Sequence, residues 1–322
     1  MSLKEFDLIK KKIKNATNVF IMGHKNIDLD AFGAALGIYC YATNCKKVAY
    51  IIIDDKKFEK SVKKVVDRFK DRVNIIKSKE IKNLYNKKSL LIVADTNKSI
   101  LLQNEEILGL FENIVVIDHH NLTEGSINGE NILILNDTNV SSTCEIITNM
   151  LDYHKYLIDS DVATILLAGI VLDTNNFVIR TNTNTYYAAY YLAKCGASPK
   201  EVQYLFKHDI NEYIEMQKVI TEVKVVDNIA ISRGLQTKIY RREELAKIAD
   251  IILLFKNIEV SFVIAKTSDG IGISARSMGN ISVAPILESF GGGGDNHEAA
   301  AVVRDKSLNQ VFEEVVKKSR KI

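Results

Sequence analysis

The sequence predicts an α/β fold in which a mostly parallel sheet forms the larger of two domains. Short apolar runs typical of buried strands alternate with longer segments whose apolar residues recur at helical spacing, and this alternation is typical of parallel βαβ units. A chain of 322 residues is also too long for one ordinary core and suits two domains. We expect the crossovers between the parallel strands to be right-handed.

The larger domain is predicted over residues 1–206. Its expected strands cover 19–22, 47–53, 89–94 and 113–117, and its expected helices cover 3–14, 30–42, 58–69, 143–153, 161–172, 182–193 and 200–206. Small residues in the helix over 30–42 permit close packing on a sheet. The helix over 161–172 is apolar on nearly every side, so we expect it to be buried, and it is too short to span a bilayer.

The pattern changes in the last third of the chain. One long helix is expected over 211–224, within a helical linker assigned to 207–225. Short strands then follow at 230–232, 261–265, 272–275 and 299–303, with helices at 242–253, 283–289 and 308–318. Residues 226–322 are therefore predicted to form a second, smaller α/β domain.

Composition narrows the class of protein. The apolar content is 47% and the net charge is +3, which excludes a basic face that holds long nucleic acid but leaves a small anionic ligand open. The four cysteines form no CxxC pair and lie in apolar helical patterns, so we expect reduced core residues. The amino terminus lacks a signal-peptide pattern. We expect a cytoplasmic location, as a separate protein or as part of a membrane-anchored parent, with no membrane contact from this chain.

The nine residues GHKNIDLDA over 23–31 are the first candidate site. His24, Asp28 and Asp30 follow a buried strand directly and precede a helix, and such loops are where open parallel sheets build their sites. Imidazole and carboxylate together suit divalent ions such as Mn²⁺, whereas a structural zinc site favours thiolates. The alternative is a polar loop in which Asp30 only caps the helix.

Further Asp and His residues stand where other elements end. Asp95 and Asp118-His119-His120 each follow an apolar strand, and Asp173 follows the buried helix. Two-metal sites need several carboxylates to hold two divalent ions and a shared water, and these residues supply that inventory. By contrast, Ser141-Ser142-Thr143 followed by Glu145 is explained as a helix cap.

The motifs taken together resemble a known family. GHKNIDLDA, VADT, IDHH and GIVLDT, in this order, are similar to the four motifs of the DHH phosphoesterase family, and the tail ISARSMGNISVAPILESFGGGGD resembles the substrate-binding domain associated with that family. The segments SSTCE, LAGIVLDTNNF and ISARS look most like the catalytic part of GdpP-type cyclic-di-AMP phosphodiesterases. The resemblance covers nearly the whole chain.

The resemblance implies two Mn²⁺ ions, for which Mg²⁺ or Co²⁺ are substitutes. The ligands that it implies are His24, Asp28 and Asp95 for one ion, and Asp30, Asp95, His119 and Asp173 for the other, so that Asp95 bridges. Asp118 would orient a histidine of the site, and His120 would face the substrate as a phosphate partner or proton donor. Two positions depart from the family pattern: Ile27 replaces a proline, which we expect to loosen the loop, and Asn97 stands where many relatives place histidine.

The glycines of the tail have a physical interpretation of their own. A glycine run lets the backbone approach a ligand and turn N–H groups towards an anion, although turns use glycine as well. Within the resemblance, the predicted substrate-binding residues are Arg276, Ser277, Gly291, Gly292, Gly293, Gly294 and His297. Asp295 and Asn296 stand between the glycines and His297, where the family usually has histidine at once. Arg180 is either a phosphate partner or an ordinary surface arginine.

The function implied is hydrolysis of cyclic di-AMP to linear pApA by in-line attack of a metal-activated hydroxide. A short-oligonucleotide exonuclease or phosphoadenosine (pAp) phosphatase of the same superfamily shares every metal ligand and stays open. A pyrophosphatase fits less well, because the glycine run and ISARS suit a nucleotide. A non-catalytic nucleotide sensor would be marked by a lost ligand, and none is lost. The expected partner is a small cyclic or linear dinucleotide, and a homodimer is left open.

Overall fold

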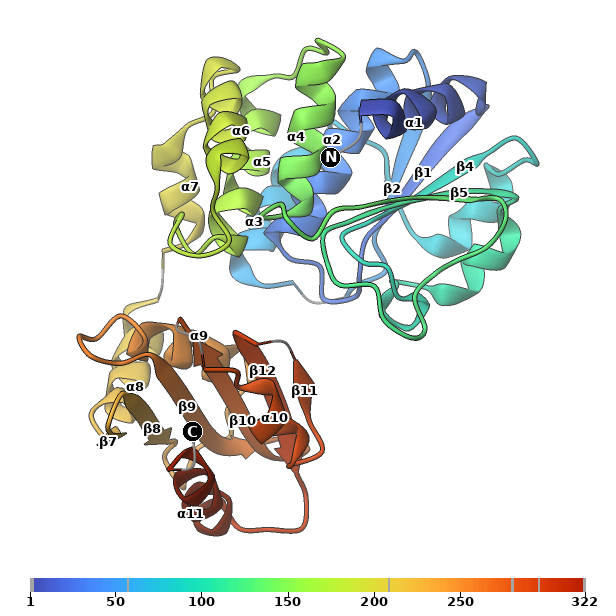
Figure 1. Cartoon of the computed structure of the whole chain (residues 1–322). Coiled ribbons are helices and arrows are strands. Elements are labelled where there is room, and N and C mark those ends of the chain that lie inside the picture. Colours follow the sequence, from blue (N-terminus) through green and yellow to red (C-terminus); the bar gives the residue numbers. More distant parts are fainter. Residues whose placement is uncertain (1–2, 57, 208, 279–280, 295, 321–322) are drawn as a thin grey trace. The chain divides into compact units, whose positions relative to one another are not determined.

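The computed structural model describes residues 3–56, 58–207, 209–278, 281–294 and 296–320. The chain divides into two compact units, Met1–Lys207 and His208–Ile322 (Figure 1). Each unit has its own six-stranded sheet. Within the described residues, no helix combines the length and the apolar character that crossing a membrane requires.

The sheet of the first unit is parallel at every pairing that the structure records. Its strands are β1 (Asn18–Met22), β2 (Val48–Ile52), β3 (Ile75–Ile76), β4 (Leu90–Ala94), β5 (Asn113–Asp118) and β6 (Ile132–Asn136), in the order β3-β2-β1-β4-β5-β6. The parallel α/β sheet is thus confirmed. The edge strands β3 and β6 were not predicted, because pairing with β2 and β5 rather than a long buried run defines them.

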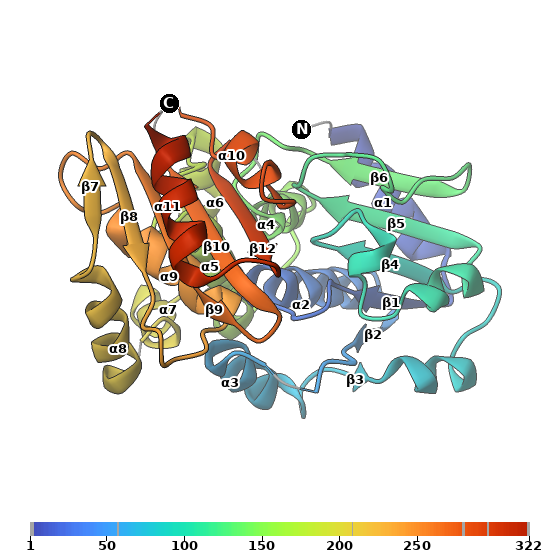
Figure 2. The same ribbon diagram turned by 90° about the horizontal axis from the view of Figure 1, so that it is seen from below.

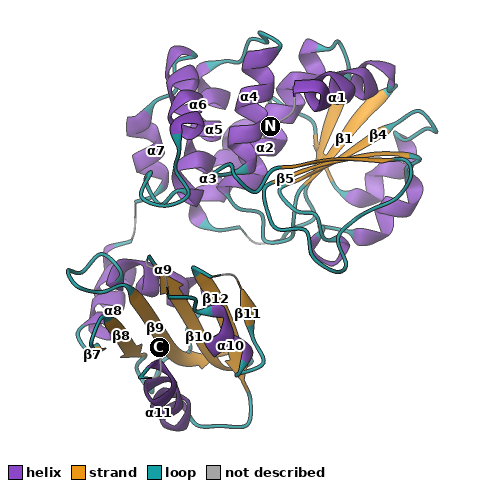
Figure 3. Cartoon of the chain, viewed as in Figure 1, coloured by secondary structure: helices purple, strands orange, loops and turns teal. Residues whose placement is uncertain are grey.

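Helices cover one face of this sheet. They are α1 (Leu3–Asn15), α2 (Leu29–Asn44), α3 (Lys60–Phe69), α4 (Thr143–Tyr153), α5 (Ser160–Asp173), α6 (Thr183–Lys194) and α7 (Pro199–Leu205). Figure 3 shows α2, α4, α5 and α6 layered on one side of the sheet. The other face carries the short 3₁₀ segments η1 (Ser78–Asn83), η2 (Ser99–Leu101) and η3 (Glu105–Leu110). Ile81 of η1 and Ile107 of η3 are buried in the same core cluster as Phe20 and Met22 of β1.

Two glycines let α2, α4 and α5 approach each other closely. A Cβ atom on Gly33 of α2 would lie 2.7 Å from the Cys144 sulfur, and one on Gly169 of α5 would lie 2.5 Å from the same sulfur and 2.9 Å from Asp30 Oδ1. Cys144 is therefore wedged between α2 and α5. All four cysteines are free, and Cys45 and Cys144 are buried as predicted, whereas Cys40 and Cys195 are only partly buried against the core.

The second unit has a mixed sheet with helices on both faces. Its strands are β7 (Lys224–Val226), β8 (Ile229–Arg233), β9 (Val260–Thr267), β10 (Gly270–Ser277), β11 (Gly293–Gly294) and β12 (Glu298–Val303), in the order β11-β12-β10-β9-β8-β7. The helices α8 (Ile210–Ile220) and α9 (Arg242–Ile252) cover one face, and α10 (Ala284–Glu288) and α11 (Leu308–Ser319) the other (Figure 2). In β9, Phe262 packs into the core beneath α10 and α11, and Val263 packs into the core beneath α8 and α9.

The helix predicted over 211–224 was wrong in its length. It ends at Ile220, and Lys224–Val226 forms β7, which pairs antiparallel with β8 across a turn at Asp227. The β-branched residues of this segment favour a strand, and a φ of +53° at Asp227 suits a tight turn. Met216 and Val219 of α8 are buried in the core of the second unit. The assignment of 207–225 as a linker between domains 1–206 and 226–322 stays a prediction.

Candidate metal centre

The strand order brings three ligand-bearing segments to one edge of the first sheet. β1, β4 and β5 are neighbours, and the residues that follow them are His24, Asp95 and His119. The chain order reverses between β1 and β4, since β2 and β3 lie on one side and β5 and β6 on the other. Such a reversal opens a crevice at the carboxyl ends of parallel strands, which is where open α/β sheets bind ligands.

The first ligand group consists of His24, Asp28 and Asp95, whose ligand atoms lie within 4.8 Å of one another. His24 Nε2 lies 3.7 Å from Asp28 Oδ2 and 3.4 Å from Asp95 Oδ2. The other ring nitrogen, Nδ1, lies 2.8 Å from the Lys25 carbonyl oxygen, which can only accept. Nδ1 therefore carries the proton in the neutral ring, and Nε2 is left as the ligand atom.

The second group consists of Asp30, His119 and Asp173. His119 Nε2 lies 3.2 Å from Asp173 Oδ2, 3.5 Å from Asp95 Oδ1 and 4.0 Å from Asp30 Oδ2. This nitrogen is buried and makes no hydrogen bond. A buried imidazole nitrogen without a hydrogen-bond partner, facing three carboxylates, fits a divalent cation. The structure also rejects Asp30 as the helix cap, because Asp28 accepts the capping hydrogen bond from Ala31 N over 2.9 Å.

Asp95 lies between the two ligand groups. Its Oδ2 faces His24 and its Oδ1 faces His119, so that one carboxylate lies between the two ligand groups. The residue is 3% exposed and has a φ of +62°, while its N–H still pairs with the Ile117 carbonyl oxygen over 2.9 Å. A left-handed conformation at a residue other than glycine is uncommon and persists where the surrounding structure enforces it, as at functional sites.

The electrostatics of the site favour a bound cation. Burial, with the charge of Asp30, raises the pKa of Asp95 well above its usual value, and burial, with the charge of Asp173, raises the pKa of Asp30 to about 6. Burial also lowers the pKa of His119 to about 4, which keeps its imidazole neutral and able to ligate. Crowded carboxylates repel each other, and a divalent ion removes that repulsion. The residues present thus fit the ions that the sequence predicts.

Asp118 positions both histidines that follow it. Its Oδ1 accepts from the backbone N–H of His119 over 2.9 Å and from His120 Nδ1 over 2.8 Å. Its Oδ2 accepts from Asn97 Nδ2 over 2.7 Å, and Asn97 is buried. Burial opposes the charged form of Asp118, but the hydrogen bond to His120 and the charges of His120 and His119 together outweigh it, so that the pKa of Asp118 falls below its usual value. The His120 side chain is 54% exposed, which leaves its Nε2 accessible.

The start of α4 contributes contacts that the sequence did not predict. Backbone N–H groups of Thr143 and Cys144 donate to the two carboxylate oxygens of Asp30, over 2.9 and 2.8 Å. Thr143 Oγ1 donates to Asp95 Oδ1 over 2.9 Å. The predicted cap is also present, since Ser142 Oγ accepts from Glu145 N. A cap signature carries no information about which carboxylates lie beside the helix start, so Thr143 had no distinguishing signal.

Three of the predicted substrate residues lie together in the second unit. Arg276 Nε lies 2.8 Å from Asp250 Oδ1, and a terminal guanidinium nitrogen lies 3.5 Å from Glu298 Oε2. Ser277 is buried, its N–H donates to the His297 carbonyl oxygen over 2.8 Å, and its Oγ makes no hydrogen bond. His297 Nδ1 lies 3.2 Å from the Ser277 carbonyl oxygen. Residues 279–280 and 295, which are near Ser277 and His297 in the sequence, lie outside the described residues.

The four glycines at 291–294 have two different structural roles. A Cβ atom on Gly292 would lie 2.2 Å from the Ala300 carbonyl oxygen, and one on Gly294 would lie 2.1 Å from the Glu298 carbonyl oxygen, so these two positions require glycine for packing on β12. A Cβ atom on Gly291 or Gly293 would meet no atom within 4 Å. Gly291 has a φ of +74°, which favours glycine, whereas the backbone of Gly293 is exposed at the edge of the sheet.

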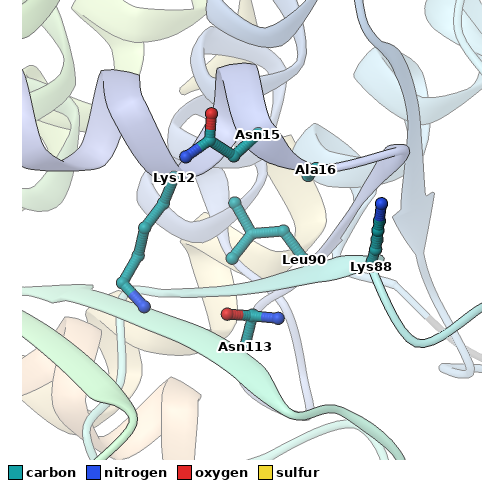
Figure 4. Close-up of a pocket in the computed structure, with 6 residues that line it drawn as sticks. All are labelled: Lys12, Asn15, Ala16, Lys88, Leu90 and Asn113. Carbon is teal, nitrogen blue, oxygen red and sulfur yellow. The ribbon is translucent and has the colours of Figure 1, made fainter.

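A cavity of about 410 Å³ lies at the opposite end of the strands (Figure 4). It is lined by Lys12, Asn15, Ala16, Lys88, Leu90 and Asn113. Leu90 and Asn113 begin β4 and β5, whereas Asp95 and Asp118 stand at the carboxyl ends of the same strands. None of the predicted site residues lines this cavity, so it has no part in the metal centre.

Comparison with known proteins gives relatives that match nearly the whole chain. The chain is 34% identical over 315 residues to the cyclic-di-AMP phosphodiesterase GdpP of Geobacillus thermodenitrificans, a match that covers 95% of this chain and 48% of that protein. It is 26% identical over 318 residues to the bifunctional oligoribonuclease and PAP phosphatase NrnA of Mycoplasma genitalium, with 95% of each chain covered. The chain thus spans about half the length of the first relative.

Among solved structures, the fold is shared with an exopolyphosphatase-related protein from Bacteroides fragilis, at a TM-score of 0.83 and 20% identity, over 98% of this chain and 96% of that one. The model of the DHH family, N-terminal domain, matches residues 18–170, and the model of the DHHA1 domain matches residues 217–321. One match lies in each unit, so the chain contains a DHH domain followed by a DHHA1 domain.

Proposed function

We propose that this chain is a metal-dependent phosphodiesterase that hydrolyses one phosphodiester bond of cyclic di-AMP to give linear pApA. The observation that carries the proposal is the buried Asp95 carboxylate between two groups of metal ligands. The substrate is proposed from relatives named as cyclic-di-AMP phosphodiesterases, which are 33% to 34% identical over 95% to 96% of this chain.

The two ligand groups would hold two Mn²⁺ ions, with Mg²⁺ or Co²⁺ as substitutes. The first would be held by His24, Asp28 and Asp95, and the second by Asp30, Asp95, His119 and Asp173. When bound, such a pair of ions lowers the pKa of a water and offsets negative charge on a phosphoryl group. The ligands are hard or borderline oxygen and nitrogen atoms with no thiolate among them, which suits manganese.

His120 is the proposed proton donor or phosphate partner. The Asp118 carboxylate has no proton to give at neutral pH, so His120 Nδ1 donates to it and the opposite ring nitrogen faces outward. Asn97 holds Asp118 from the other side, which fixes the ring orientation. A hydrogen bond from His120 to a phosphate oxygen or to the leaving 3′ oxygen would stabilise the charge that develops there.

The second unit is proposed to bind the rest of the dinucleotide. Ser277 Oγ is a buried hydroxyl without a hydrogen bond, and the backbone at Gly291 and Gly293 is exposed with open space above it. Arg276 supplies a cation beside them, held by Asp250 and Glu298. These features suit a phosphate and the edge of a base. We assign the reaction to the cytoplasm, either of a separate protein or of a longer membrane-anchored one.

A second candidate function follows from the name of one relative. The NrnA protein of Mycoplasma genitalium is named as an oligoribonuclease and PAP phosphatase and matches over 95% of both chains. The metal ligands are those expected for either activity, so only the substrate distinguishes them. A non-catalytic sensor is the third candidate, and the complete set of ligands is the observation against it.

One assay separates these candidates. The purified chain, loaded with Mn²⁺, is compared side by side on cyclic di-AMP, cyclic di-GMP, pApA and phosphoadenosine phosphate. The proposal expects the highest kcat/KM on cyclic di-AMP, with pApA as the product. Turnover of pApA or phosphoadenosine phosphate without hydrolysis of cyclic di-AMP would support the second candidate. Binding of a nucleotide without turnover of any of the four would support the sensor.

A further inference from the structure

Gln103 uses all of its side-chain hydrogen-bonding capacity beside the first ligand group. Its Nε2 donates to the His24 carbonyl oxygen over 2.8 Å and to Asp55 Oδ2 over 2.9 Å. Its Oε1 accepts from the backbone N–H groups of Asp54 and Asp55, over 2.9 and 3.0 Å. A primary amide has two donors and one doubly accepting oxygen, so no capacity is left over. Gln103 thus joins the segment after β2 to the loop after β1.

Asp55 extends this link to the far half of the same loop. Its Oδ2, which receives Gln103 Nε2, also accepts from the backbone N–H of Ile27 over 2.9 Å. The main chain of the loop is therefore held from outside at residue 24 and again at residue 27. These two points lie at, or next to, the metal-ligand positions His24 and Asp28. Between them, Lys25 N donates to the Leu101 carbonyl oxygen over 2.7 Å.

The hydrogen bond from the Ile27 N–H to Asp55 exists because position 27 is not a proline. A proline there would fix φ and present no N–H, so it would restrain the loop without a partner. Ile27 has an N–H that needs an acceptor, and its side chain is 2% exposed. The Asp55 carboxylate supplies that acceptor. The looser loop that the sequence predicts is thus restrained by a hydrogen bond.

We propose that Gln103, acting with Asp55, is a positioning residue for His24 and Asp28 and thereby sets the affinity of the first ligand group for a divalent cation. This inference rests on the proposed function, since the cation is the one proposed there. The second ligand group is placed differently: Asp30 is held by the start of α4, and Asp173 ends α5. The side-chain hydrogen bonds of Gln103 run to residues 24, 54 and 55. Its loss should therefore weaken one of two ions.

The test measures Mn²⁺ binding without substrate, by isothermal titration calorimetry. Gln103→Met removes every side-chain hydrogen bond of Gln103 while keeping a similar side-chain volume. Gln103→Glu keeps the acceptor oxygen but loses both bonds that the side chain donates. The control is Asn104→Ala, one residue along, because the Asn104 side chain bonds to Glu106 N and Ser78 Oγ and not to the loop. Partners behind a metal ligand typically change affinity ~10–100-fold. We expect a weakening of that size in one binding step for both Gln103 variants, and none for Asn104→Ala.

Several results would overturn the inference. They are unchanged binding of both ions in folded Gln103→Met, equal weakening of both steps, or the same single-step loss in Asn104→Ala. If Gln103→Met does not fold, Gln103→Glu decides by the same criteria. A wild-type chain that binds no Mn²⁺ would instead reject the proposed metal-dependent function, so the two failures are distinguishable. The Asp55 contribution is tested by Asp55→Ala, which should weaken the same step less in an Ile27→Pro background, where the N–H to be accepted is gone.

Discussion

Thr143 Oγ1 donates a hydrogen bond to Asp95 Oδ1 across 2.9 Å, and through it the first residue of α4 contacts the carboxylate that lies between the two ligand groups. The backbone N–H of the same residue donates to Asp30. A ligand oxygen that accepts a fixed hydrogen bond keeps its orientation whether or not the ion is bound. The start of α4 therefore positions one shared ligand and one ligand of the second group.

The first prediction concerns this hydroxyl. Thr143→Val keeps the shape of the side chain and removes the donor, so Asp95 loses orientation and kcat/KM should fall by about 10–100-fold, the range typical of partners behind a metal ligand. Thr143→Ser retains the hydroxyl and should stay near the wild-type value. Steady-state kinetics on cyclic di-AMP measure both. Equal activity of the valine and serine variants would show that the hydroxyl has no such role.

The second prediction concerns Asp95 itself. Asp95→Asn should lower activity by orders of magnitude and reduce bound Mn²⁺, because both ions lose a charged ligand. Asparagine tolerates the left-handed conformation with a φ of +62°, so the fold should be kept. Metal content and circular dichroism, measured on the same sample, separate loss of ions from unfolding. Near-normal turnover with two ions bound would mean that Asp95 is not the bridge.

The third prediction concerns the metal. We expect EDTA to abolish hydrolysis and added Mn²⁺ to restore it better than Ca²⁺ does, because the predicted ligands include imidazole nitrogens as well as carboxylates, whereas Ca²⁺ prefers an all-oxygen shell. The measurement is the initial rate on cyclic di-AMP after dialysis and re-addition of each ion. Full turnover in EDTA would contradict the proposed chemistry.

The fourth prediction uses the two kinds of glycine. Gly293→Val adds a side chain where the structure has open space, so the fold should be kept, while kcat/KM for cyclic di-AMP should fall because the backbone can no longer be approached. Hydrolysis of bis(p-nitrophenyl) phosphate should be largely retained, since this small compound lacks the second nucleotide. The measured quantity is the ratio of the two activities. Equal loss on both substrates in a folded variant would mean that Gly293 does not select the nucleotide.

Gly292→Ala is the matched control for that experiment. Its Cβ atom would lie 2.2 Å from the Ala300 carbonyl oxygen, so this variant should lower the unfolding temperature of the second unit. Comparison of the two variants separates a glycine that the fold requires from a glycine that leaves room for a ligand.

The sequence could predict which Asp and His residues lie together in the candidate site, but not the contacts that hold them. His24, Asp95 and His119 stand directly after buried strands, and parallel strands bring such positions together whatever their separation in the chain. The side chains of Gln103 and Thr143 bond to a main-chain oxygen 79 residues away and to a carboxylate 48 residues away, respectively. A glutamine or threonine that makes such a bond has the same local pattern as one on the surface, so only the folded chain distinguishes them.

The helix predicted over 211–224 was too long because its end, too, depends on a contact that only the folded chain shows. Residues 211–224 have apolar residues at helical spacing, and the spacing alone does not show where the helix stops. The end at Ile220 follows from the hairpin between β7 and β8, in which Val225 and Val226 pair with Ala230 and Ile229. Tertiary pairing thus overrides a weak local preference for helix.

The proposed metal ligands are dispersed along the chain, which would affect how the protein matures. They begin at His24 after β1 and end at Asp173 on the last turn of α5, so a growing chain holds an incomplete set of ligands until α5 has been synthesised and packed. Ions that bind only the finished site stabilise the folded unit by mass action and give partly folded chains no comparable stabilisation. Under the proposed function, the supply of divalent cation would then set the yield of intact first units, apart from its effect on the rate of each finished molecule.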